Sequence, residues 1–256
     1  MGFLYESNES AEPDHNEATL SMSYLKFDRR LMANLDESTQ REYIRTNRKG
    51  AYCCSSIVGC NTRKYHGVLV IPVPELSENN HVLLSSLDLT IVQHGVPFNV
   101  GIHEYEGDIF SPKGHKYIRE YNVDIASSTT YRVGGVVLQK EFLFCHYTNR
   151  MLLRYTLLEA HSRTTLRLSP FLAFRDVKML THRNDQCHGD YGQAKSGVTF
   201  CLYPGYPTLY LQLSKAHNFV SDPHWNERIE YIKERERGYE YTEDLYVPGY
   251  FEVDIE

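Results

Sequence analysis

Apolar and polar side chains alternate along several short runs of the chain, and this period of two is the pattern of half-buried strands. In residues 163–169 leucine or threonine alternates with charged or polar side chains, and in 209–213 three leucines occupy every second position. Each run predicts a strand with one face in a core and the other in water.

Further β-favouring runs are separated by turn residues, and residues 82–93 and 96–103 predict a hairpin around His94-Gly95. We expect a break at Ser169-Pro170 and a turn at 246–250 that leads to a strand ending near Ile255. The remaining expectations are strands at 117–125, 136–144 and 151–158, a short helix or strand at 25–32, a helical turn at 36–42 and a long loop at 184–197.

No stretch after Gly50 carries an apolar stripe of helical period over three turns. The predicted fold class is therefore all-β, a large antiparallel β-sandwich with long loops and a few short helices. Residues 1–22 are polar and acidic, so we expect a disordered leader there and a single sandwich domain over 23–256.

Composition excludes some classes of partner but does not indicate a specific function. Hydrophobic residues make up 41% and charged residues 23% of the chain, which is ordinary for a globular protein, while the 20 tyrosines favour β-structure. A net charge of −6 gives no whole-chain attraction to nucleic acid or anionic membranes, so neither is an expected partner. The sequence shows no membrane span and no secretory signal, and its six cysteines lack a disulfide framework, so we expect a cytoplasmic location.

The stretch from Tyr43 to Ile71 concentrates groups suited to a sugar. Between two β-favouring runs it places a guanidinium, an ammonium, a phenol ring and an imidazole in consecutive positions, Arg63, Lys64, Tyr65 and His66. A sugar needs donors and acceptors for its hydroxyls and an aromatic surface for its C–H faces. The alternative interpretation is a solvated turn in which the tyrosine and histidine serve packing.

Two further groups carry chemistry, each with a plain alternative. Arg175 and Asp176 could hold a pair of sugar hydroxyls, or could form an ordinary ion pair at a strand end. The carboxylates between Glu236 and Asp244 could include a glycosidase pair, although a solvated charged face is more common.

Residues 182–190 hold metal-capable side chains without the spacing of a zinc site. Phosphate-binding, dinucleotide and acyl-transfer motifs are missing from the sequence. We predict no metal, no cofactor and no catalytic residue within this chain.

The run from Asn61 to Val70, preceded by Thr46-Asn47 and Gly50-Ala51-Tyr52, resembles the N-terminal domain of bacterial and archaeal glycogen debranching enzymes. Later segments agree with that family in the same order. They are Phe174-Arg175-Asp176, Tyr203-Pro204-Gly205, Glu234 to Gly238, and Glu243 to Tyr246 with Pro248-Gly249. The similarity covers most of residues 40–252. Arg48-Lys49 and Ala51 stand where the family tends to be Gly-rich, and Cys53-Cys54 stand where small residues are usual.

The resemblance implies a supersandwich-like β-domain that precedes an (α/α) barrel, where the amylo-α-1,6-glucosidase carboxylates reside. Nothing in this sequence resembles the barrel, so we expect a non-catalytic part of a glycoside hydrolase. Its expected partners are an α-glucan, such as glycogen or a maltooligosaccharide, and the barrel. The expected substrate-binding residues are Arg63, Lys64, Tyr65, His66, Arg175 and Asp176. The alternatives are a purely structural interaction domain and a domain with its own 4-α-glucanotransferase activity.

Overall fold

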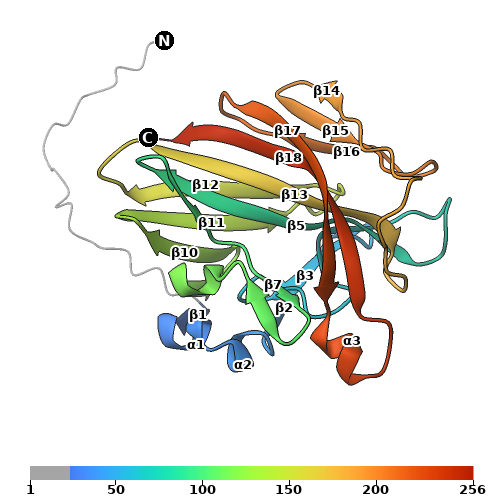
Figure 1. Cartoon of the computed structure of the whole chain (residues 1–256), viewed down its shortest axis with the longest axis horizontal. Coiled ribbons are helices and arrows are strands. Elements are labelled where there is room, and N and C mark those ends of the chain that lie inside the picture. The colour runs from blue at the N-terminus through green and yellow to red at the C-terminus, as the bar shows by residue number, and fades with distance from the viewer. Residues whose placement is uncertain (1–23, 256) are drawn as a thin grey trace, which may run out of the picture.

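The structure, a computed structural model, describes residues 24–255 and shows two layers of antiparallel sheet (Figure 1). The leader predicted at 1–22 lies outside the described residues. Among the described residues no helix is both long and apolar enough to cross a membrane. The all-β sandwich predicted from alternation is confirmed.

The larger layer is a ten-stranded sheet. Its spatial order is β2-β3-β4-β5-β13-β18-β17-β7-β8, and β6 pairs with β5 beside this path. In chain order its strands are β2 (Glu42–Thr46), β3 (Tyr52–Ser56), β4 (Gly67–Pro72), β5 (Asn80–Gln93), β6 (Val96–Asn99), β7 (His103–Tyr105), β8 (Ile109–Ser111), β13 (Thr164–Asp176), β17 (Asn218–Glu230) and β18 (Thr242–Ile255).

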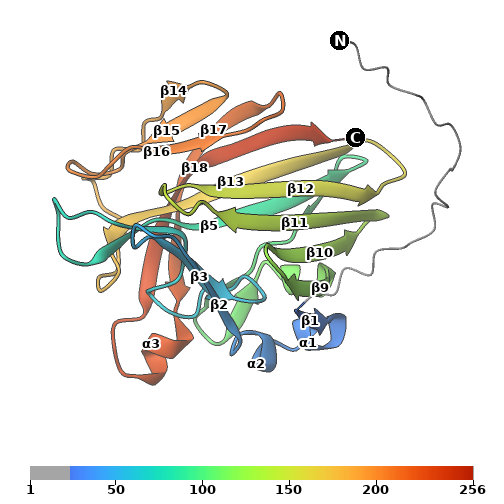
Figure 2. The same cartoon turned by 180° about the vertical axis from the view of Figure 1, so that it is seen from behind.

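The second layer consists of two smaller sheets. One has five strands in the order β1 (Leu25–Asp28), β9 (Ile118–Val123), β10 (Ser127–Val133), β11 (Val136–Phe144) and β12 (Met151–Glu159). The other has three strands, β14 (Gly192–Ala194), β15 (Gly197–Phe200) and β16 (Leu209–Gln212). In Figure 2 the strands β11 and β12 lie in front of β5 and β13. The short helices are α1 (Arg29–Ala33), α2 (Leu35–Ser38), α3 (Ile232–Glu236) and the 3-10 turn η1 (Gly114–Tyr117).

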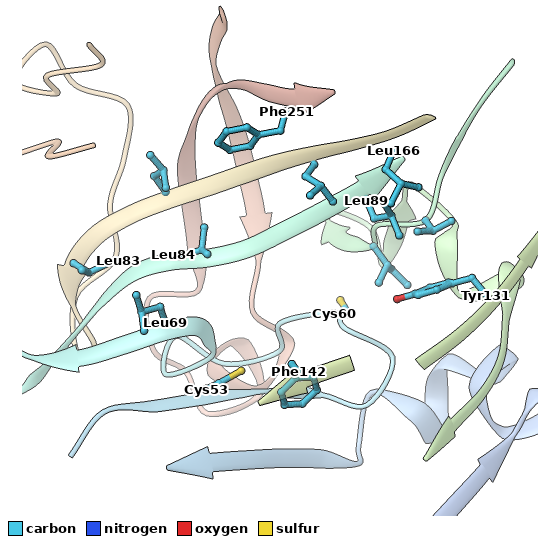
Figure 3. Close-up of a cluster of buried hydrophobic side chains, with 14 of the residues drawn as sticks. Cys53, Cys60, Leu69, Leu83, Leu84, Leu89, Tyr131, Phe142, Leu166 and Phe251 are labelled. Carbon is cyan, nitrogen blue, oxygen red and sulfur yellow. The ribbon is translucent and has the colours of Figure 1, made fainter. Parts of the chain in front are cut away.

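The main core lies between the layers. Leu84 and Leu89 of β5 and Leu166 of β13 belong to the same buried cluster as Tyr131 of β10 and Phe142 of β11, so both layers contribute to it (Figure 3). Burial of such side chains contributes about 1.5–3 kcal/mol each, which makes the contact between layers the main source of stability. A second, smaller apolar cluster lies away from this interface and includes Val70, Phe171 and Tyr231.

The predicted hairpin is confirmed at its turn, where His94 and Gly95 have φ of 50° and 77°. Positive φ at both central residues defines the two-residue turn that suits the twist of paired strands. The strand after it is shorter than predicted, because it ends at Asn99 and a separate strand starts at His103.

The break predicted at Ser169-Pro170 and the turn predicted at 246–250 are wrong as chain interruptions, because β13 and β18 continue through both. The pairing of the two strands is nevertheless interrupted there, between the pairs Leu168–Phe251 and Leu172–Tyr246. A proline cannot donate to a ladder hydrogen bond, so it is tolerated where the ladder is already open. β17 and β18 run across the top of Figure 1 and then turn downward.

Candidate functional site

The predicted sugar-binding residues 63–66 lie in the loop between β3 and β4. His66 N donates to the Arg63 carbonyl over 3.1 Å, which closes a tight turn just before β4 begins at Gly67. The loop is anchored from inside by Asn61, whose side chain accepts from Ser55 Oγ over 2.7 Å and donates to the Ser85 carbonyl over 3.1 Å. The loop is therefore fixed to strands β3 and β5.

His66 is the buried support of this turn. Its side chain is 1% exposed, and Nδ1 accepts a hydrogen bond from Thr62 N over 3.1 Å. An Nδ1 that accepts carries no proton, so in the neutral ring the proton lies on Nε2. Nε2 faces Glu42 Oε1 over 3.4 Å. In this position the imidazole cannot touch a ligand and instead fixes the shape of the loop.

Glu42, at the start of β2, binds this loop from the neighbouring strand. Its Oε1 accepts from Arg63 Nε over 2.7 Å, beside the contact to His66. The nearby His66 imidazole is the largest influence on the pKa of this carboxyl group. Together with Arg63 it outweighs the effect of partial burial and lowers the pKa of Glu42 to about 2. Glu42 therefore stays ionised and holds the Arg63 guanidinium in one orientation.

Lys64 meets a part of the chain that the sequence did not connect with it. Its ammonium lies 5.3 Å from the ring centroid of Tyr239, and the Arg237 guanidinium lies 4.9 Å from the same centroid. Tyr239 is 53% exposed. A cation near an aromatic ring is attracted to its face, so the two charges and the ring form one surface group, which we call the Lys64–Tyr239–Arg237 cluster.

Helix α3 sets the position of Tyr239. Tyr239 N donates to the Glu234 carbonyl over 3.1 Å and Gly238 N to the Arg235 carbonyl over 3.0 Å, the paired bonds of a Schellman cap. The cap requires a left-handed residue, and Gly238 has φ of 72°. Lys233 N donates to the Thr62 carbonyl over 3.0 Å, so the helix is attached directly to the loop that carries Lys64.

Tyr65 lies between the surface and the smaller apolar cluster. Its ring packs against that cluster, and its carbonyl accepts from the Tyr52 hydroxyl over 2.9 Å. Burial raises the pKa of Tyr52, so its hydroxyl stays protonated and remains a donor. Tyr65 is half-buried and reaches the surface beside Lys64.

Arg175 is 4% exposed and forms a bidentate ion pair with Glu243, which is fully buried. Its Nη2 donates to Glu243 Oε2 over 2.9 Å, its Nε donates to Oε1, and the Tyr231 hydroxyl also donates to Oε2. Burial alone would lower the pKa of Arg175, but the charge of Glu243 outweighs it and raises that pKa. The guanidinium therefore joins β13 to β18 and does not face solvent.

Asp176 belongs to a separate polar group. Its Oδ2 accepts from Ser77 Oγ over 2.8 Å and from Asn79 Nδ2 over 2.9 Å, while Oδ1 accepts from Lys178 N over 2.9 Å. Burial acts to raise the pKa of Asp176, but these hydrogen bonds together lower it. His81 extends the group, because Nε2 lies 3.0 Å from Ser77 Oγ. Asp176 thus fastens the 73–79 loop to the end of β13.

The structure brings four of the six predicted residues into one loop and links a fifth to it. Tyr231 connects them, because it binds Glu243 beside Arg175 and lies in the apolar cluster against which Tyr65 packs. Asp176 contacts a different loop. Sequence reasoning missed the roles of Glu42, Tyr231 and Tyr239. The only sequence signal for this part of the site was that Tyr239 and Glu243 lie beside or within segments that resemble the family.

The carboxylates considered for glycosidase chemistry have protein partners. Glu243 is paired with Arg175, Glu236 Oε2 lies 2.9 Å from Lys233 Nζ, and Glu240 Oε1 lies 3.1 Å from His182 Nε2. Over residues 24–255 the structure also assembles no group of three or more histidine, cysteine or acidic side chains that could hold a metal ion.

Of three comparisons with known proteins, one returned a match. Searches among curated proteins and among solved structures returned no match. The profile of one protein family, described as "Glycogen debranching enzyme N terminal", matches residues 41–256. That match includes every element from β2 onward, the 61–67 loop and the Arg175–Glu243 pair. The chain therefore belongs to the glycogen debranching enzyme N-terminal family.

Proposed function

We propose that this domain positions α-glucan for a debranching enzyme that hydrolyses α-1,6 branch points, and that it docks the catalytic barrel. The observation that carries the proposal is the Tyr239 ring, which is 53% exposed and has the Lys64 and Arg237 cations close to it. The exposed part of the ring covers the C–H face of a glucose unit, and the charged donors beside it reach its hydroxyls.

The six predicted residues divide by exposure in this proposal. Arg63, Lys64 and Tyr65 are partly exposed and contact glucan. His66 and Arg175 act through their neighbours, because both are buried and engaged in fixed contacts. Asp176 positions the adjoining 73–79 loop. Preorganisation of this kind favours binding, since the protein loses little side-chain freedom when the sugar arrives.

Titration calorimetry with maltoheptaose tests the glucan contact. The chain is expected to bind the sugar, and Tyr239→Ala is expected to weaken binding roughly tenfold, about 1.4 kcal/mol, because the stacking face is removed. Tyr147→Ala is the matched control. Tyr147 is also an exposed tyrosine, with the Arg48 guanidinium 5.3 Å from its ring centroid, but it lies on the β11–β12 connection.

Two results would separate the alternatives. If neither the chain nor its complex with the barrel binds maltoheptaose, the glucan contact is refuted and a purely structural interaction domain is the better account. If the isolated chain redistributes the chain lengths of maltoheptaose, the domain has its own transferase activity. That chemistry needs two carboxyl groups about 5 Å apart at the sugar.

A further inference from the structure

A large apolar groove lies on the side of the sandwich where the second layer is divided. Its volume is about 1260 Å³. Its floor is formed by strands β4, β5, β13 and β18 of the ten-stranded sheet, including Leu69, Leu83, Leu84, Leu166 and Phe251. Figure 3 shows these five side chains among the strands of that sheet.

The two walls of the groove are strands with free edges. β12 closes one end of the five-stranded sheet and pairs with β11 alone, and β16 closes one end of the three-stranded sheet and pairs with β15 alone, within residues 24–255. Residues 149–155 on one wall and 207–213 on the other line the same groove. Each edge therefore presents backbone N–H and C=O groups without a strand partner toward the gap.

The side chains along the groove are apolar but only partly buried. They pack against the main core and keep part of their surface exposed, and they are Val68, Leu87, Met151, Leu153, Tyr155, Leu157, Leu211 and Leu213. A groove lined by partly exposed apolar side chains is typical of an interaction site. The leucines of the floor offer no hydrogen bonds to the hydroxyls of a glucan, and the polar side chains of the groove, such as Arg150, Arg154 and Gln212, lie on its two walls.

We propose that a β-strand from the remainder of the debranching enzyme fills this groove. The two facing edges select an extended strand, since only its backbone satisfies donors and acceptors on both sides, and the leucine floor selects alternating apolar side chains. The matched family is described as the N-terminal part of glycogen debranching enzymes, so we assign the strand to the rest of such an enzyme. Added there, the strand joins the five-stranded and three-stranded sheets into one continuous layer.

Hydrogen–deuterium exchange tests this proposal on the 256-residue chain and on the complete enzyme. In the complete enzyme the outward-facing amides of β12 and β16 are expected to exchange at least tenfold more slowly, because they gain strand partners. Equal exchange of these amides in both proteins would overturn the proposal. Amides of β5 and β13, which are paired on both sides, serve as the internal reference.

A pair of variants on β12 gives an independent readout. Leu153→Glu places a charge in the groove, whereas Leu158→Glu changes an exposed leucine of the same strand that does not line it. Leu153→Glu is expected to lower the Tm of the complete enzyme more than that of the 256-residue chain, and Leu158→Glu to affect both equally. An equal loss from Leu153→Glu in both proteins would refute the strand. Glucan binding at Lys64 and Tyr239 does not enter this test and is measured separately.

Discussion

At the scale of single residues, one carboxylate organises the loop that carries the proposed glucan contacts. Glu42 accepts from Arg63 and faces the buried His66, while His66 holds the backbone of Thr62. The basic side chains of this loop are therefore oriented by groups beneath them. Rotamer freedom that has already been lost in the folded state does not oppose ligand binding.

The low pKa of Glu42 predicts how replacing this residue changes stability with pH. A carboxyl group whose folded pKa is about 2 and whose unfolded value is 4.5 stabilises the fold above pH 4.5, and this contribution disappears as pH falls toward 2. Glu42→Gln should therefore unfold more easily than the parent chain at pH 6, and the difference should shrink by pH 3. Urea unfolding at both pH values measures it.

Glu75→Gln is the control for this comparison, because Glu75 is an exposed carboxylate in the β4–β5 connection. It should change the unfolding free energy little at either pH. A deficit of Glu42→Gln that stays constant between pH 6 and pH 3 would show that proton binding at Glu42 is not linked to folding.

The residue types of the glucan-binding hypothesis were readable from the sequence, but their exposure was not. Arg63, Lys64, Tyr65 and His66 are consecutive, yet only His66 is buried. That difference depends on Glu42 and on α3, which lie far from the loop in sequence. Tyr239 becomes a neighbour of Lys64 only because Lys233 binds the Thr62 carbonyl.

At the scale of elements, strands β13 and β18 connect the candidate site to the ten-stranded sheet. Arg175 of β13 and Glu243 of β18 form a buried pair, and Arg167 and Glu252 form a second pair between the same strands nearer the surface. Two buried charges are costly to separate, because the one left behind has neither water nor a partner. The buried pair therefore holds the strands in register below the loop.

Replacing one member of the buried pair should be strongly destabilising. We expect Arg175→Leu to lower the free energy of unfolding by about 3–5 kcal/mol, since it leaves Glu243 buried and unpaired. Arg167→Leu, on the same two strands, should cost about 1 kcal/mol or less. Denaturant titration of both variants makes the comparison.

The double variant Arg175→Leu/Glu243→Met checks the cause. It should recover part of the loss, because no isolated charge remains. Losses that simply add, or equal costs for Arg175→Leu and Arg167→Leu, would contradict the assigned role.

Gly249 lies in β18, opposite Ser221 of the paired strand β17. It has φ of 138°, and a Cβ there would lie 2.0 Å from the Val220 carbonyl oxygen. Gly59 also has a positive φ, of 86°, but a Cβ added to it would meet no atom within 4 Å. Gly59→Ala therefore measures the cost of backbone strain without a steric clash. Gly249→Ala should lower the free energy of unfolding by roughly 1–3 kcal/mol more than Gly59→Ala, because overpacking adds to strain. Equal losses in denaturant titrations would contradict the close approach.

Alternation in two runs and β-favouring composition in others predicted many of the strands, whereas prolines misled the prediction of where they end. Pro170 and Pro248 both lie where the β13–β18 ladder is open, so their missing or diverted hydrogen bonds cost little. A proline in a strand indicates a break in the pairing with a neighbouring strand, but the sequence alone does not say whether the chain also reverses its direction there. That depends on the neighbouring strand, which is a property of the sheet.

At the scale of the whole molecule, the two layers form two separate candidate binding surfaces. The ten-stranded sheet carries the 61–67 loop and α3 beyond its paired core, and the divided second layer leaves the groove between β12 and β16. The resemblance to the debranching family was visible from ordered segments of sequence. The groove was not visible, because it arises from which strands end each sheet.

Steady-state kinetics of the complete debranching enzyme with Lys64→Met tests the central claim most directly. Methionine keeps most of the length of the side chain and removes its charge, so the claim predicts a KM for branched glucan raised roughly tenfold, with kcat unchanged and the domain still assembled. Lys49→Met, at an exposed lysine in the β2–β3 turn, should leave KM unchanged. An unaltered KM for Lys64→Met in an assembled enzyme would contradict a role for this loop in positioning glucan.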